Sequence, residues 1–257
     1  MFEKFHREKF EETLGKHAGQ KQELEQKQAE EIQTLKAEAE AAAYRDKERL
    51  EELRAEMADI TGAKENSAKP EQNENSFESL KKDWQDFYQE TFGIESDFSK
   101  IEIPEKQEGF ERLIVMEKGM TAQKLFDKCK ELFFAWKYTE EDLDKIIKSD
   151  RSAEKEAYAV WIREGVEADE ELKNLSANDI EKKGIKTETL EERLLDEIRF
   201  FKKKGKHLDM KNLTLCSGSR NSDGFVPDVH WRDYRMEVTW SPPGYHRGDL
   251  RARQAVS

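Results

Sequence analysis

The sequence predicts a mainly helical α+β protein, with a long N-terminal helix, a flexible linker, a helical domain and a small β-rich C-terminal module. Three observations lead to this prediction. Residues 1–60 contain no proline and are rich in Glu, Lys, Gln and Ala, which form helices readily. All five tryptophans lie from Trp84 onward, so we expect the packed core in the last two thirds of the chain. Short β-branched and aromatic runs separated by turn residues fill residues 213–257.

The composition restricts the function classes. Charged residues make up 40% of the chain, against about 25% in ordinary globular proteins, and the formal net charge is −12. This balance argues against non-specific attraction to nucleic acid or to an anionic membrane. No apolar run approaches the roughly 18 residues that a membrane-spanning helix needs, and mixed charges follow Met1–Phe5 at once. We therefore expect a cytoplasmic protein without a membrane partner, with Cys129 and Cys216 reduced.

Residues 1–60 are expected to form one long polar helix. Two stretches show the 3-4-3 spacing of a coiled coil, at Ile32, Leu35, Ala39 and Ala42, and at Leu50, Leu53, Met57 and Ile60. Between them the seam falls on Asp46 and Arg49, so the heptad phase breaks. Weak self-association through residues 24–60 and a solvated lone helix or partly disordered arm both stay open. Residues 61–76 contain Gly62 and Pro70 and no aromatic residue, which predicts a flexible linker.

The first half of the domain expected at residues 77–212 combines helices with a strand. Apolar residues recur at 3- and 4-residue steps from Phe77 to Phe92, and Gly93 is expected to end this helix. Residues 98–103 alternate toward Pro104 and predict a short extended piece. The apolar run 113–116 predicts a buried strand, and Thr121 opens a helix whose apolar face runs to Phe133.

The second half of this domain carries helix-start signals. Ser or Thr followed three residues later by an acidic residue is typical of a capping box, and this pattern predicts helices after Thr139, Ser176 and Thr189. Gly184 and Gly205 are expected to end the last two. The β-branched and aromatic run 158–162 predicts a second strand.

The final module, residues 213–257, has a different character. Strands are expected at residues 213–216, 225–226, 236–240 and 250–256, with turns at residues 221–224 and 241–244. Lysine disappears after Lys211, whereas six arginines follow. Arginine is favoured where planar stacking or bidentate pairing is needed.

Aromatic residues interleaved with arginine in short polar loops are typical of a recognition surface. The candidate ligand-binding residues are Arg220, Trp231, Tyr234, Trp240, Tyr245 and Arg247. The alternative is that Trp231 and Trp240 form the core of the β-rich module. Residues 217–257 hold six arginines against five acidic residues, so nucleic acid is not expected as a partner.

The sequence contains no recognisable catalytic motif. His207, Asp209 and Cys216 lie close in sequence, but no hydrolase signature surrounds them, and Cys216 is expected to be a buried strand residue. Residues 217–220 predict a hairpin turn, with an anion site as the alternative. The spacings of metal, phosphate-loop and dinucleotide sites are all missing, so we expect neither a metal nor a cofactor.

The leading hypothesis from the residues is a non-enzymatic binding protein whose C-terminal module contacts a small ligand or a protein partner. A scaffold protein acting through its N-terminal helix is the alternative. An enzyme of unrecognised type comes third.

Residues 78–257 resemble an uncharacterised family of predicted bacterial proteins, which brings no assigned activity. The resemblance rests on Ala157–Arg163, Glu167–Ala177, Leu215–Arg220 and Leu250–Ser257. The C-terminus is also similar to the variable segments of target proteins of diversity-generating retroelements, in which a β scaffold is kept while surface-loop residues vary. This similarity implies that the variable positions are Asn221, Ser222, Asp223, His230, Tyr234, Tyr245 and His246.

Overall fold

The computed structural model describes residues 74–257, which belong to the second of two compact units, Glu71–Ser257. The expected helix at residues 1–60, its self-association through residues 24–60 and the linker up to residue 73 lie outside the described residues. The helix expected from Phe77 begins slightly earlier, at Glu74.

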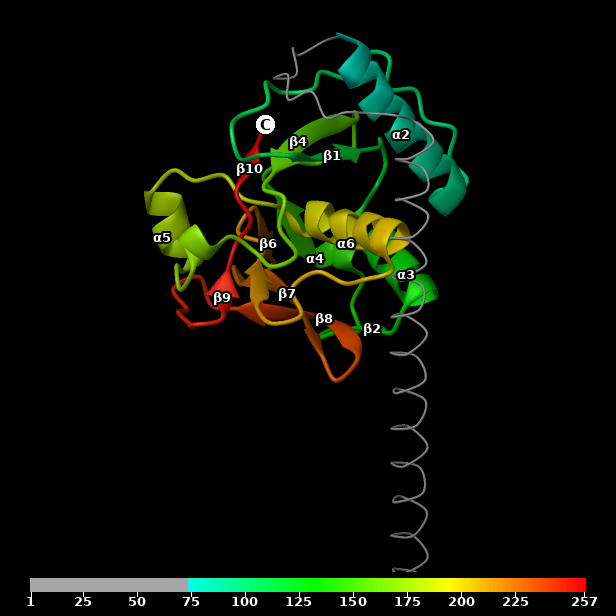
Figure 1. Cartoon of the computed structure of the whole chain (residues 1–257). Helices are drawn as coiled ribbons and strands as arrows, with labels where there is room; N and C mark the ends of the chain where they lie inside the picture. The colour runs from blue at the N-terminus through cyan, green and yellow to red at the C-terminus, as the bar shows by residue number, and fades with distance from the viewer. Residues whose placement is uncertain (1–73) are drawn as a thin grey trace, which may run out of the picture. The chain divides into compact units, whose positions relative to one another are not determined.

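Helices and strands alternate in the first part of the described chain, and after residue 204 only strands follow (Figure 1). The helices are α2 (Glu74–Phe92), α3 (Ala122–Leu132), α4 (Leu143–Ile146), α5 (Ala177–Lys182) and α6 (Leu190–Lys204), with a 3-10 turn η1 (Glu170–Leu172). The strands are β1 (Arg112–Met116), β2 (Ala135–Lys137), β3 (Ile147–Ser149), β4 (Tyr158–Ile162), β5 (Leu213–Leu215), β6 (Ser219–Asn221), β7 (Val226–Arg232), β8 (Arg235–Ser241), β9 (Leu250–Arg251) and β10 (Ala255–Val256).

The prediction of a mainly helical fold is wrong. The described residues are 30% helix and 23% strand, with ten strands in three sheets beside five helices, which makes an α/β fold with a β-rich C-terminal half. Six of the strands contain only two or three residues. Such short strands cannot display a period-2 pattern in the sequence, because pairing with distant partners decides their conformation.

The three-stranded sheet has the order β1-β4-β10. β1 pairs antiparallel with β4 from Arg112 opposite Ile162 to Met116 opposite Tyr158, and β10 adds to the other edge of β4. The two strands predicted at residues 113–116 and 158–162 are thereby confirmed. In contrast, residues 98–103 hold no strand.

The largest sheet has the order β2-β8-β7-β5-β9. Its centre is the antiparallel hairpin β7–β8, which is paired from Val226 opposite Ser241 to Arg232 opposite Arg235. β2 comes from the other half of the chain and pairs in parallel with β8. β3 and β6 form a separate two-stranded sheet. Strands from before and after residue 212 therefore share all three sheets.

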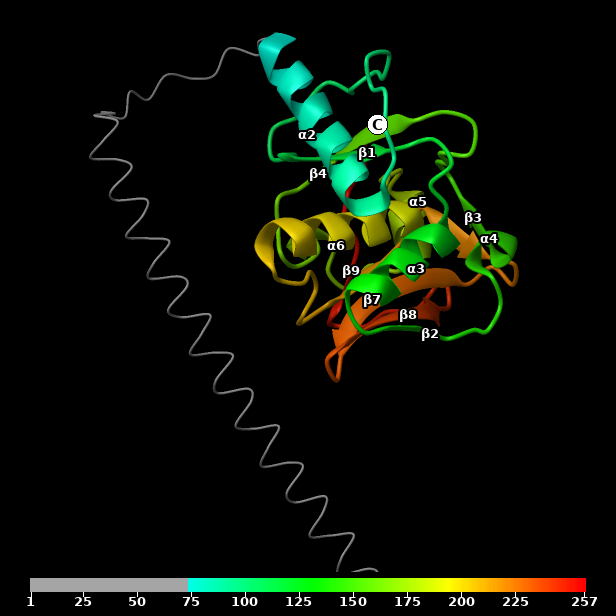
Figure 2. The ribbon, with the colours of Figure 1, turned by 90° about the vertical axis from the view of Figure 1, so that its right-hand side faces the viewer.

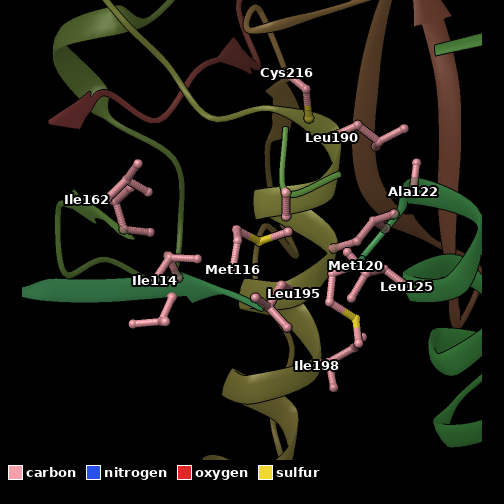
Figure 3. Close-up of a cluster of buried hydrophobic side chains, with 14 of the residues drawn as sticks. Ile114, Met116, Met120, Ala122, Leu125, Ile162, Leu190, Leu195, Ile198 and Cys216 are labelled. Carbon is pink, nitrogen blue, oxygen red and sulfur yellow. The ribbon is translucent and has the colours of Figure 1, made fainter. Parts of the chain in front are cut away.

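Helices α3 and α6 lie on one side of β7 and β8, as both ribbon views show (Figures 1 and 2). The buried residues on this side of the hairpin are Val229, Met236 and Val238, and they join one hydrophobic core with the helices. Leu125 of α3 and Leu195 and Ile198 of α6 point into the same cluster (Figure 3). The opposite face of the hairpin is left without a covering helix among the described residues.

The capping signals were partly right. The capping boxes at Ser176 and Thr189 are both present, and Gly205 ends α6 with a φ of 60°. The box expected at Thr139 is absent, because the helix is capped by Asp142 and lasts only four residues before β3 begins. Within residues 74–257, no helix has the length and apolar character required to cross a bilayer.

Candidate functional site

The two faces of the β7–β8 hairpin differ in chemistry. One face carries the apolar residues that contact the helices. The alternate positions carry polar side chains, Asp228, His230 and Arg232 on β7 and Arg235, Glu237 and Thr239 on β8. The register sets His230 opposite Glu237 and Asp228 opposite Thr239. Because side chains alternate across a strand, these polar groups gather on the uncovered face.

A groove with a volume of about 790 Å³ lies over this polar face. Trp136 of β2 and Tyr138, which directly follows this strand, line it at one side, together with residues of the segment 221–225 that leads into β7. The segment after β8 contributes Pro242, Tyr245 and Arg247. This volume lies within the range of small-molecule sites, which is about 300–1,000 Å³.

The floor of the groove consists of ionisable side chains that are almost completely buried. Asp228 is 1% exposed, Glu237 is 2% exposed and His230 is 4% exposed. Charged residues are rarely buried to this extent unless they are paired. The floor is therefore more than the solvated face of an ordinary antiparallel sheet, because the surrounding side chains enclose it.

Both carboxylates on the floor are held by neighbours on β8. Asp228 accepts hydrogen bonds from the hydroxyls of Thr239, at 2.5 Å, and Ser241, at 2.9 Å. Glu237 accepts one from Nε of Arg235 at 2.7 Å, and its other oxygen lies 3.7 Å from Arg232. These contacts fix the carboxylates in place before any ligand arrives.

His230 lies between the two carboxylates. Its Nδ1 is 3.5 Å from Oδ1 of Asp228, and its Nε2 is 3.3 Å from Oε2 of Glu237. Neither ring nitrogen makes a hydrogen bond to any part of the chain that the structure describes. A buried polar side chain almost always has a hydrogen-bond partner, so the imidazole, which lies only at ion-pair distance from two carboxylates, has hydrogen-bonding capacity that the described chain does not use.

The rim of the groove is aromatic. Within residues 74–257, eight large apolar side chains are exposed, and four of them line the groove: Trp136, Tyr138, Phe225 and Tyr245. Phe134 precedes β2, and Tyr234 lies in the turn between β7 and β8. Scattered exposed apolar residues need no explanation, but a cluster around one groove marks an interaction site.

Three of the six residues predicted from the sequence line this groove: Trp240, Tyr245 and Arg247. Trp231 lies on the other face of β7, where its ring contacts His207 at a centroid distance of 3.6 Å. Tyr234 is 74% exposed at the tip of the hairpin, with a φ of 65°.

Arg220 lies apart from the groove, beside a smaller hollow of about 390 Å³. Its Nη1 donates to the carbonyl oxygens of Ser217 and Ser219, at 2.7 and 2.8 Å, so the guanidinium is bound to its own turn. Gly218 packs so closely that a Cβ there would lie 3.0 Å from the Thr187 oxygen. The segment 217–220 therefore packs against the start of α6, where the Ser219 hydroxyl accepts a hydrogen bond from the Leu190 N–H.

His207, Asp209 and Cys216 do not form a catalytic set. Asp209 binds Arg193 and Arg253, whereas Nδ1 of His207 lies 2.9 Å from Glu197. Cys216 points into the apolar cluster beside Leu190 (Figure 3). Burial raises the pKa of the Cys216 thiol well above its ordinary value, so the reactive thiolate is suppressed.

Asp209 instead belongs to a buried cluster of charges. Burial alone would raise the pKa of Asp209, but the guanidinium groups of Arg253 and Arg193 outweigh it and hold this pKa below its ordinary value. Three guanidinium groups in the cluster are paired with three carboxylates, namely Arg193 with Glu197, Arg253 with Asp209, and Arg112 with Asp196. None of these residues lines the groove.

Sequence reasoning missed the buried carboxylates Asp228 and Glu237 on the floor and the exposed aromatic pair Trp136 and Tyr138 on the rim. The missed signal is the alternation along residues 226–232, where Asp228, His230 and Arg232 take every second position. A run of polar residues at period 2 within a strand indicates one shared face.

Two hydroxyl side chains lie beside the Asp228 carboxylate. The hydroxyls of Thr239 and Ser241 both donate to Asp228. Across residues 74–257, the His, Cys, Asp and Glu side chains form no group of three or more arranged to hold a metal ion. No protein-family model, curated protein or solved structure matches this chain.

Proposed function

We propose that this is a binding protein that recognises a small ligand or a segment of a partner in the groove over the β7–β8 hairpin. One observation carries the proposal: the groove has a buried, polar floor with an imidazole that makes no hydrogen bond to the described chain, inside an aromatic rim. Recognition sites combine apolar contact area with a few positioned polar groups. This site has both.

The composition of the lining supports recognition. Arginine, tryptophan and tyrosine dominate binding hot spots, because each offers a large contact area together with a polar end. The groove contains three arginines, Arg232, Arg235 and Arg247, beside its aromatic residues. Arg235 also lies over the Trp136 ring, 5.0 Å from its centroid, which holds both side chains at the rim.

The similarity to variable segments of retroelement target proteins supports the same surface. Seven positions were expected to vary, and five of them line the groove: Asn221, Ser222, Asp223, His230 and Tyr245. These positions come from β6, the following loop, β7 and the loop after β8. Loop and strand residues that gather on one face are suited to changing specificity while the scaffold is kept. The proposal includes a cytoplasmic location, which follows from the sequence alone.

A fragment screen tests the proposal without assuming a ligand class. Amide NMR spectra of the full chain would be recorded with a chemically diverse small-molecule library. We expect the shifts that bound fragments cause to concentrate on residues of β2, β7 and β8 that line the groove, because a preformed site with an aromatic rim binds fragments best.

The matched variants are Trp136→Ala, which removes a groove wall, and Phe134→Ala, which removes an aromatic side chain from the same segment outside the groove. Trp136→Ala should abolish most hits, and Phe134→Ala should leave them. Hits that map elsewhere, or survive Trp136→Ala unchanged, would refute the groove as the binding site.

A further inference from the structure

The floor of the groove presents hydrogen-bond acceptors and donors side by side. The carboxylates of Asp228 and Glu237 accept only, the guanidinium of Arg235 donates only, and the imidazole of His230 can do either. A ligand must therefore offer donors and acceptors a few ångströms apart. Hydroxyl groups do this best, because each one donates once and accepts twice.

The charges on the lining argue for a neutral ligand. Arg235 is bound to Glu237 at 2.6 Å, Arg232 lies 3.7 Å from the same carboxylate, and Arg247 is bound to Asp249 at 2.7 Å. All three guanidinium groups of the groove therefore already lie beside a carboxylate. A phosphate or carboxylate in the groove would also lie beside Asp228 and Glu237. A cation would meet the arginines. Burying either kind of charge without a full partner is costly, because the charge loses its hydration, so an ionic ligand is disfavoured.

The backbone gives a second restriction. β7 and β8 are paired with each other along their whole length, and β7 is also paired with β5 and β8 with β2. The floor between β7 and β8 therefore offers side chains and no strand edge, whereas β2, at one side of the groove, is an edge strand of the sheet. Extended peptides are commonly bound through backbone hydrogen bonds to a strand edge, so this floor lacks the feature that such a peptide uses.

The rim supplies flat apolar surfaces. The rings of Trp136 and Tyr138 are 5.9 Å apart at an angle of 74°, and both are at least one-third exposed. They form two walls of an open corner above the polar floor. A ligand ring with an apolar C–H face and hydroxyl groups at its edge would contact both surfaces at once.

We infer that the groove binds a carbohydrate: an uncharged sugar ring whose hydroxyl groups bind Asp228, His230 and Glu237 while its C–H face packs against Trp136. The inference rests on the proposed function and names the ligand class for that groove. The unbonded ring nitrogens of His230 are the groups that the sugar satisfies.

The experiment titrates the full chain with cellobiose, maltose and N,N′-diacetylchitobiose, using saturation-transfer NMR and calorimetry. Glucose 1-phosphate and triglycine are the charged and peptide comparison probes. At least one neutral disaccharide should bind, and more tightly than both comparison probes. Trp136→Ala should weaken this binding about tenfold, the effect of losing one good aromatic contact. Phe134→Ala should leave it unchanged.

His230→Phe provides the sharpest variant. It keeps a ring of similar size and removes both nitrogens, which make no hydrogen bond to the described chain. Because the two nitrogens lie 3.5 and 3.3 Å from the buried carboxylates of Asp228 and Glu237, the variant is expected to melt below the wild-type temperature, and its binding is measured well below its own melting point. Its sugar binding should fall by about tenfold or more, as expected for a lost hydrogen-bonding group.

Two results would overturn the inference. The first is binding of triglycine or glucose 1-phosphate without binding of any neutral disaccharide. The second is unchanged sugar binding in the folded His230→Phe variant. If fragments bind in the groove but sugars do not, the carbohydrate inference fails and the proposed binding function stands. If neither binds there, both fail.

Discussion

Asp209 and Arg253 form a fully buried ion pair, with 2.8 Å between Oδ1 and Nη2, although they are 44 positions apart in the sequence. Arg253 also donates to the carbonyl oxygens of Gly165 and Val166, at 3.0 and 2.8 Å. One side chain thereby joins the C-terminal segment to two loops. Removing one partner of a buried pair leaves an uncompensated charge, which is far more costly than losing an exposed pair.

Arg253→Met should therefore lower the free energy of unfolding by about 3–5 kcal/mol, because Asp209 loses a partner and two carbonyl groups lose donors. Urea denaturation measures this loss. The matched control is Arg247→Met, which removes an exposed arginine six residues earlier in the sequence and should change stability by about 0.5 kcal/mol or less. Equal losses in both variants would show that burial of the pair is unimportant.

Glu188 should make the protein less stable as the pH rises. Its carboxylate is fully buried, and neither oxygen has a hydrogen-bond partner within the described residues. Burial, followed by repulsion from Asp196, raises the pKa of Glu188 well above its ordinary value, although Arg253 and Arg193 oppose this. The neighbouring guanidinium groups already balance three other carboxylates, so ionising Glu188 would add an uncompensated charge.

Between the ordinary pKa and the raised one, folded Glu188 holds a proton that the unfolded chain releases. The free energy of unfolding therefore falls as pH rises through this window. Glu188→Gln keeps the neutral form, so its stability relative to wild type should increase by about 1 kcal/mol or more between pH 5 and pH 8, since one pKa unit is worth about 1.4 kcal/mol. Thermal melts across this range measure the effect, with exposed Glu171→Gln as the control. A difference that is constant with pH would contradict it.

Tyr234 is expected to make the fold less stable than glycine would at the same position, because its backbone is left-handed. Asp233 and Tyr234 connect β7 to β8 and have φ values of 48° and 65°. A left-handed conformation costs about 1–2 kcal/mol for a residue with a Cβ, and glycine avoids this cost while losing some chain entropy. Tyr234→Gly should therefore raise the free energy of unfolding by about 0.5–1 kcal/mol. Chemical denaturation tests this, with Tyr245→Gly, at a residue without a positive φ, expected to give no gain. A loss of stability in Tyr234→Gly would show that the contacts of the tyrosine outweigh the strain.

The sequence predicted the parts of the fold that depend on neighbouring residues. The capping boxes at Ser176 and Thr189 need only a side chain and an N–H three positions away, and both are present. Gly205 ends α6 because its left-handed conformation suits glycine. β2 could not be predicted in the same way. It follows α3 after two residues and extends only because β8, from far along the chain, pairs with it.

The candidate site likewise contains residues that local sequence could predict and residues that only distant strand pairing brings together. Tyr245 and Arg247 were selected from their loop chemistry and line the groove, as does Trp240, which lies near the end of β8. Trp136 was missed because nothing near it in the sequence indicates that β2 lies beside β8. Trp231 was selected for its arginine neighbours, but it points to the helix side, since it is one position out of phase with His230. One residue of register in a strand decides between the two faces.

The pairing of β2 with β8 has a kinetic consequence. Closing a loop of about a hundred residues costs entropy before any contact repays it, and such non-local pairing slows folding. The hairpin β7–β8 can form early from local contacts, but Trp136 and Tyr138 reach it only when β2 docks. The hairpin alone therefore has the polar floor without its aromatic wall. A ligand that needs both the floor and the wall will bind only protein chains in which β2 has already docked on β8. Once bound, it will slow the detachment of β2.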